Sequence, residues 1–158
     1  MKFILDAITN EILLKIPAIE NCISYAKGRE ELDAPVVFLG ITNYSVGHDP
    51  ATGQLALVAH VEARVVIDST IDDAEFIVQN LACKIANVAH LNSFGQEISP
   101  AVVSSISKDE FHPDFDVYLC WLIEWSHEMH VGESVWNNEQ PQIPVHTIVI
   151  NGDDHHAV

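Results

Sequence analysis

Alternating apolar and polar side chains in residues 114–127 predict the central strand of this protein. In DFDVYLCWLIEWSH, the odd positions from Phe115 to Trp125 are all apolar. A period of two with many aromatic and β-branched residues is typical of a strand with one buried face. We therefore predict that Trp121 and Trp125 point into the core.

The same alternation predicts a long β-hairpin over residues 35–67. The run PVVFLGITNY covers residues 35–44, and residues 55–67 have an apolar side chain at every odd position, with His60, Glu62 and Arg64 on the other face. The connection at residues 45–54 is rich in turn-forming residues. A hairpin of this length should project beyond the core of a small domain and is expected to meet a partner.

Apolar residues at steps of three and four predict two amphipathic helices. The first covers residues 2–14, and Pro17 prevents it from continuing. The second covers residues 70–90. Thr70 and Asp73 are spaced like an N-terminal capping box with a short acid. The second helix is therefore expected to begin at this pair.

Shorter runs at residues 19–27 and 101–107 predict two more strands. The order of elements indicates an α+β fold: a mixed, mostly antiparallel sheet with two helices packed on one face, a projecting hairpin and an extended C-terminal arm. Residues 1–150 are expected to form one domain, with the arm starting near residue 130. Residues 151–158 are predicted to be a flexible tail.

The segment after His127 contains few residues that could pack locally, and only residues 145–150 look like a strand. Trp136 lies in this segment, and an exposed large aromatic often marks a contact. Together with the hairpin loop, this region provides the predicted interface with other subunits or partners. The predicted interface residues are His48, Asp49, Pro50, Gly132, Trp136, Pro141 and Pro144.

Composition indicates a soluble, folded protein located in the cytoplasm. The chain has 158 residues, is 48% hydrophobic and 19% charged, and contains no apolar run long enough to span a membrane. Its N-terminus lacks the features of a signal peptide. Cys22, Cys83 and Cys120 are an odd number of widely spaced thiols, so we expect them to be reduced and buried.

The charge is strongly acidic, with 23 acids against 7 bases and a formal net charge of -16. Such a surface repels phosphate backbones, so sequence-specific binding of nucleic acid is not expected. An acidic surface would nevertheless suit a channel through which DNA slides without sticking. We treat this as a hypothesis, which a basic channel with the acids on the outer rim would contradict.

Nine histidines raise the question of a metal site or an enzyme. The best-spaced pair is His127 and His130, but the strand pattern fades there and helical spacing cannot be assumed, so surface histidines are the expected reading. No nucleophile elbow or phosphate-binding loop occurs in the sequence. We therefore predict no catalytic residues, no metal and no cofactor, with a small metal- or ligand-dependent enzyme using His127 and His130 as the alternative.

A series of packing motifs follows in order over residues 92–136. They are an aromatic-Gly step, a Pro-Ala-x-Val strand, a D-x-Y strand ending in W-x-x-E-W, and a later Gly-x-x-x-Trp. This run resembles the C-terminal half of small tail proteins of Mu-like and related prophages. The motif residues are Phe94, Gly95, Pro100, Ala101, Val103, Asp116, Tyr118, Trp121, Glu124, Trp125, Gly132 and Trp136.

The plan of the whole chain is similar to the phage tail terminator family, including the lambda-type terminator. The resemblance implies a structural virion protein that forms a homo-oligomeric, hexameric ring. It further implies that this ring caps the tail tube, stops its polymerisation and offers a surface for head attachment. The implied partners are the tube protein and a head-completion protein, in the bacterial cytoplasm and then in the virion tail. Two further alternatives are another neck or tail-completion protein, and a module that binds a peptide at an exposed strand edge.

Overall fold

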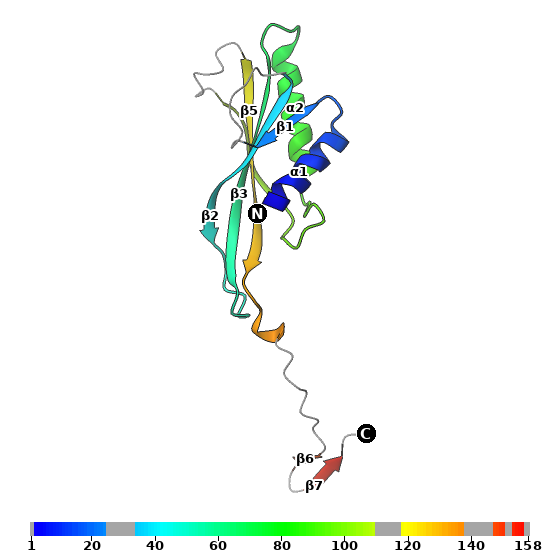
Figure 1. Cartoon of the computed structure of the whole chain (residues 1–158), viewed down its shortest axis with the longest axis vertical. Helices are drawn as coiled ribbons and strands as arrows, with labels where there is room; N and C mark the ends of the chain where they lie inside the picture. Colours follow the sequence, from blue (N-terminus) through cyan, green and yellow to red (C-terminus); the bar gives the residue numbers. More distant parts are fainter. Residues whose placement is uncertain (1, 25–33, 110–117, 138–146, 151–152, 157–158) are drawn as a thin grey trace.

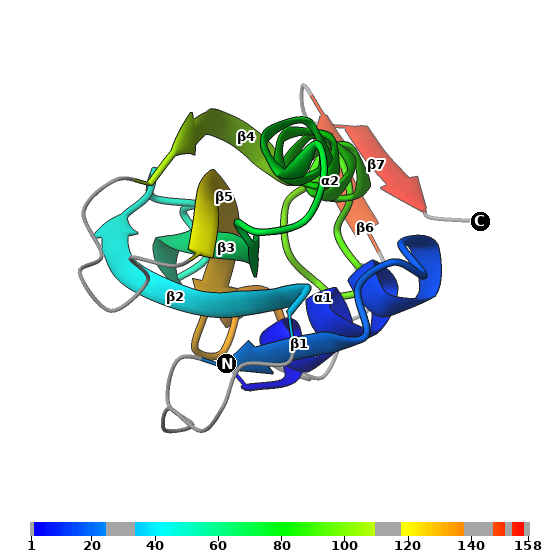
Figure 2. The same cartoon turned by 90° about the horizontal axis from the view of Figure 1, so that it is seen from above.

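The computed structural model describes residues 2–24, 34–109, 118–137, 147–150 and 153–156. Two helices pack on one face of a five-stranded sheet, as Figure 1 and the view from above in Figure 2 show. The sheet is mixed and mostly antiparallel. The predicted α+β class is therefore confirmed.

The five strands are arranged in the order β1-β2-β3-β5-β4. The short β1 pairs in parallel with β2, and every other neighbouring pair is antiparallel. Pairing of β2 with β3 confirms the predicted hairpin. The strands are β1 (Asn21–Ser24), β2 (Val36–Val46), β3 (Leu55–Asp68), β4 (Val102–Lys108) and β5 (Tyr118–Val131).

The inner face of the sheet consists of the apolar alternation in β3 and β5. Val61 lies opposite Trp125, and Ala63 lies opposite Ile123, all on the face that the helices cover. Trp125 is 1% exposed, and Trp121 packs half-buried against the same core. The predicted inward direction of both tryptophans is confirmed.

The two helices cover this inner face. α1 (Lys2–Lys15) buries Ile4, Ile8 and Ile12, which recur every four residues and so form one stripe. α2 (Ala74–Ala89) buries a stripe of alanines and branched aliphatic residues. Complete burial of each isoleucine contributes roughly 1.5–3 kcal/mol, so the apolar stripes hold both helices on the sheet.

The predicted capping box is wrong. α2 begins at Ala74, and the N-cap residue Asp73 has a φ of 59° with no side-chain hydrogen bond to the helix. The hydroxyl and backbone N–H of Thr70 instead donate to Asp68 Oδ1 at 2.7 and 2.8 Å. A local turn at the end of β3 therefore takes the hydroxyl that the sequence assigned to the cap.

β2, β3 and β5 extend together beyond the helices (Figure 1). From Thr42 to Val46, every residue of β2 is exposed, whereas Val36 to Gly40 are buried. The predicted projection of the hairpin is present. We call this projecting three-stranded part of β2, β3 and β5 the blade.

The C-terminal region differs from the sequence prediction. β5 continues to Val131, four residues beyond the predicted end, and a short 3-10 helix, η2 (Val135–Asn137), follows. β6 (Thr147–Ile150) pairs with β7 (Asp153–His156), and β7 lies in the segment predicted to be a flexible tail. In the described part of the chain, no helix is both long and apolar enough to cross a membrane.

Candidate functional site

The loop of the hairpin and the start of the C-terminal arm meet at the far end of the blade. The Val135 backbone N–H donates to the Thr52 carbonyl at 2.8 Å, and Gln54 Nε2 donates to the Gly132 carbonyl at 3.0 Å. These contacts join residues about eighty positions apart in sequence. We call residues 47–55 and 131–136 together the distal surface.

Two glycines allow the loop and the arm to approach each other. Gly53 has a φ of 77°, and a Cβ atom there would lie 2.8 Å from Val135 Cγ1. Gly132 has a φ of 108°, in the region that glycine adopts far more readily than other residues. Gly53 therefore permits the close approach of the loop to the arm, and Gly132 permits the turn of the backbone after β5.

The predicted interface residues of the hairpin loop lie at this junction. His48 and Asp49 are exposed and Pro50 is partly exposed. The Asp49 carboxylate accepts a hydrogen bond from the Ala51 backbone N–H at 2.9 Å, which is an Asx turn at the tip. The structure therefore brings His48, Asp49 and Pro50 to the same end of the molecule as Gly132 and Trp136.

Pro141 and Pro144, the two remaining predicted interface residues, lie outside the described residues. Their contribution to the distal surface therefore stays a prediction. The five predicted residues that the structure describes all belong to the distal surface.

The distal surface carries exposed apolar side chains in addition to Trp136. Trp136 is 77% exposed, and Val135 beside it is also exposed. Leu55 and Val131 lie opposite each other at the ends of β3 and β5 and are exposed as well. Sequence reasoning missed Leu55 because the alternation of residues 55–67 assigned it to the core, and it gave no role to Val131 and Val135. Only the position of the helices shows that the core ends before Leu55.

The outer face of the sheet, opposite the helices, is apolar and buried at one end, where Val36, Phe38, Val66 and Cys120 pack together, and charged in its middle. Glu62 and Glu124 lie directly opposite each other on β3 and β5. Arg64 bridges Glu62 and Asp109, with N–O distances of 2.7 Å to each. One guanidinium therefore compensates two carboxylates, while Glu124 accepts a hydrogen bond from the Ser105 hydroxyl.

His127 is a core residue, contrary to the expectation that it lies on the surface. It is 1% exposed, because β5 continues past it and turns its side chain to the inner face. Trp125 Nε1 donates to His127 Nε2 at 3.1 Å, so the ring proton is on Nδ1 and is donated to the Ser99 carbonyl at 2.8 Å. Burial lowers the pKa of His127, and the bond to Ser99 acts in the opposite direction. The imidazole is thus neutral, with both nitrogens engaged.

His130 is exposed on the outer face of β5, so it points away from His127. The two histidines cannot ligate one ion from opposite faces of a strand. Among the described residues, no group of three or more His, Cys, Asp or Glu side chains is placed to hold a metal. The geometry therefore gives no support to the alternative of an enzyme built on this pair.

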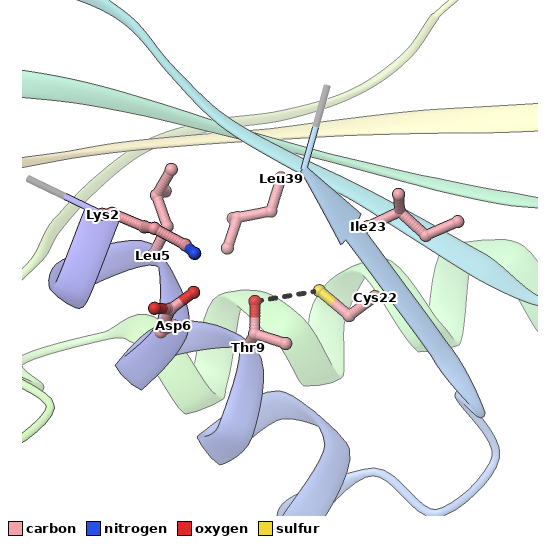
Figure 3. A pocket seen from close by; sticks show the side chains of 7 residues that line it. All are labelled: Lys2, Leu5, Asp6, Thr9, Cys22, Ile23 and Leu39. Carbon is pink, nitrogen blue, oxygen red and sulfur yellow. Dashed lines mark hydrogen bonds between the residues drawn. The ribbon is translucent and has the colours of Figure 1, made fainter. Parts of the chain in front are cut away.

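A cavity of about 430 Å³ lies between α1 and the β1–β2 edge (Figure 3). In this cavity, the Cys22 thiol donates a hydrogen bond to Thr9 Oγ1 at 3.6 Å. Burial raises the pKa of Cys22, so the thiol stays protonated and is a poor nucleophile. The lining residues are Lys2, Leu5, Asp6, Thr9, Cys22, Ile23 and Leu39.

The three thiols are expected to differ sharply in reactivity. Cys83 is exposed, which corrects the expectation that all three are buried, whereas Cys120 is buried. Burial, with a contribution from Asp109, raises the pKa of Cys120 to about 12 from 9.0, which lowers its thiolate fraction about 1000-fold.

In native protein at pH 8, a chromogenic thiol reagent should label Cys83 rapidly and Cys120 only after denaturation. A Cys83→Ser control should lose the fast phase, and fast labelling that persists in it would contradict this assignment.

The fold and the distal surface define a small α+β protein with a projecting, apolar-tipped blade. No protein-family model matches the chain, and no curated protein matches it either. Function is therefore inferred from the sequence motifs and from the arrangement of the residues described above.

Proposed function

We propose that this protein is a ring-forming structural subunit of a phage tail, similar to tail terminators. Such a ring would cap the tail tube, stop its polymerisation and present a surface for head attachment. The observation that carries the proposal is the distal surface. There, a projecting hairpin loop and the start of the arm join to expose Trp136 and its aliphatic neighbours.

The distal surface is suited to contact with a protein. Its large side chains are exposed at the end of a rigid, hydrogen-bonded blade rather than on a loop alone. Large apolar groups kept exposed in this way commonly mark protein contacts. We assign the distal surface to the tube protein, and the ring itself to contacts between copies of the chain.

The charged middle of the outer face supports a second part of the proposal. A subunit that turned its helices outward would direct Glu62, Glu124 and Asp109 toward the ring axis, three carboxylates against the one guanidinium of Arg64. Carboxylates along the channel would repel the DNA backbone and let DNA pass without adhering. A structure of the assembled ring with lysine and arginine side chains lining its channel would contradict this orientation.

The proposal can be tested by electron microscopy of tails assembled with and without the protein. Without it, tube lengths should spread widely, because nothing stops polymerisation at a fixed length. With wild-type protein, lengths should be uniform and each tube should end in a ring. Uniform tube length in its absence would overturn the proposed function.

A further inference from the structure

Two free strand edges on opposite sides of the sheet could join copies of this chain. In the described part of the protein, β4 pairs with β5 on one side and with no strand on the other. Its free edge begins at Val102, because the backbone of Ala101 is bonded to Leu91 and Asn92. β1 covers β2 only from Val36 to Leu39, so the edge of β2 from residue 40 to residue 46 is also free of any described strand. We infer that these two edges pair between neighbouring copies, and this inference rests on the proposed ring.

The first argument is the lack of charge on both edges. Exposed edge strands usually carry charged side chains or proline, which prevent pairing with other chains. Residues 40–46, GITNYSV, and residues 102–107, VVSSIS, contain neither, although the chain as a whole has a net charge of -16. The only charge on β4 is at its last residue, Lys108, which forms an ion pair with Glu75. Copies of so acidic a chain repel each other wherever acids meet. Charge-free edges are therefore where two copies can approach at least cost.

Each edge carries one irregularity, a register shift at Thr42 in β2 and at Ser104 in β4. Bulges of this kind can turn an edge away from a partner. Here each shift involves a single residue, and regular pairing resumes on both sides of it. The backbone on both sides of each shift therefore remains extended and available to a neighbour.

The second argument is strand direction. Across the sheet, β2 and β5 run one way, and β3 and β4 run the other. In a ring, neighbouring copies are related by rotation about the ring axis. If the strands run nearly parallel to that axis, the rotation leaves the direction of every strand unchanged. The β4 of one copy would then meet the β2 of the next as an antiparallel neighbour, which continues the alternation of the sheet.

The third argument is the level of the two edges. Val102 faces Ser126, Ser126 faces His60, and His60 faces Asn43, so these four residues form one row across the sheet. By the same registers, the two free edges overlap from the row of Gly40 and Ser105 to the row of Asn43 and Val102. Inclining the strands to the ring axis, as in closed barrels, would lengthen this overlap.

The two edges also explain how a ring could close. They are different surfaces on opposite sides of one subunit, so the contact is heterologous. A heterologous contact closes into a ring when the angle between neighbouring copies is a whole fraction of 360°. Pairing would also cover Val102, which is 61% exposed.

The test places acids on one edge at a time. Thr42→Asp/Asn43→Asp alters the β2 edge, and Val102→Asp/Ser107→Asp alters the β4 edge, at four exposed positions. Native mass spectrometry and sedimentation velocity would measure assembly, and circular dichroism would confirm folding. Wild-type protein should form rings at high concentration, and each variant alone should lose them.

A mixture of the two variants provides the decisive measurement. Each variant retains one intact edge, so an equimolar mixture should form a heterodimer that cannot grow. A matched control, Asn10→Asp/Leu14→Asp on the exposed face of α1, adds the same charge away from both edges and should still form rings.

The remaining outcomes separate this inference from the proposed function. Rings formed by the edge variants as readily as by wild type would overturn edge pairing and leave the proposed function standing. Wild-type protein that stays monomeric at every concentration would overturn edge pairing, and tube length with and without the protein would then decide the proposed function by itself. A mixture of the variants that stays monomeric would also overturn the head-to-tail contact.

Discussion

Replacing Trp136 by alanine is expected to abolish capping of tail tubes while leaving the folded subunit intact. Trp136 is 77% exposed in the isolated chain, so its truncation should change the free energy of unfolding by less than about 0.5 kcal/mol. A tryptophan at the centre of an interface commonly contributes about 2–4 kcal/mol to binding, which corresponds to roughly 30- to 1000-fold in dissociation constant. Tube length in electron micrographs and thermal unfolding of the purified variant would measure the two effects.

The chain offers a matched control for this substitution in Phe76. Phe76 on α2 is 74% exposed and lies outside the distal surface. Phe76→Ala removes an equally exposed aromatic side chain and should leave capping unchanged. If Trp136→Ala unfolded the protein, the arm would belong to the core. If both variants capped normally, the distal surface would not be the contact with the tube.

Acidification below about pH 6.5 is expected to lower the free energy of unfolding through His127. The pKa of His127 is lowered in the folded protein, so the unfolded chain binds the proton more readily. The contribution of His127 to the free energy of unfolding is therefore fully present above the ordinary pKa of histidine. It is lost as the pH falls below that value, by at most about 1.4 kcal/mol per pH unit. The physical reason is that a proton on Nε2 would face the N–H of Trp125 and place a buried charge in the core.

Urea denaturation at several values between pH 5 and pH 8 would measure this effect. His127→Gln has no titrating group and should flatten the dependence in that range, at a cost in stability at pH 8. His60→Gln is the matched control, because His60 lies half-exposed on the outer face and contacts the Ser45 hydroxyl at 3.0 Å. A pH dependence unchanged by His127→Gln but removed by His60→Gln would contradict this role.

The predicted interface shows how far sequence reasoning reached for the site. Turn-forming residues marked His48, Asp49 and Pro50 as a loop, and isolation from any apolar pattern marked Trp136 as exposed. Neither signal placed the loop beside the arm. The contacts between Thr52 and Val135 and between Gln54 and Gly132 depend on β5 running antiparallel to β3 as far as Val131. Pairing over that distance in sequence is a property of the assembled sheet.

The sequence by itself determined the inner face of the sheet, the hairpin and the two helices. It could do so because a strand repeats every two residues and a helix about every 3.6, so the buried positions follow from local spacing. Trp125 on β5 and Ile8 on α1 are buried for that reason.

Only the tertiary structure decided which ends of these elements are covered. His127 continues the strand pattern without being apolar, and it is buried because Trp125, Ser99 and Phe94 surround its ring. Leu55 satisfies the apolar pattern of β3 and is exposed because the helices end before it. Periodicity records which way a side chain points, whereas burial also requires a second layer above it, and only the packing of distant segments supplies that layer.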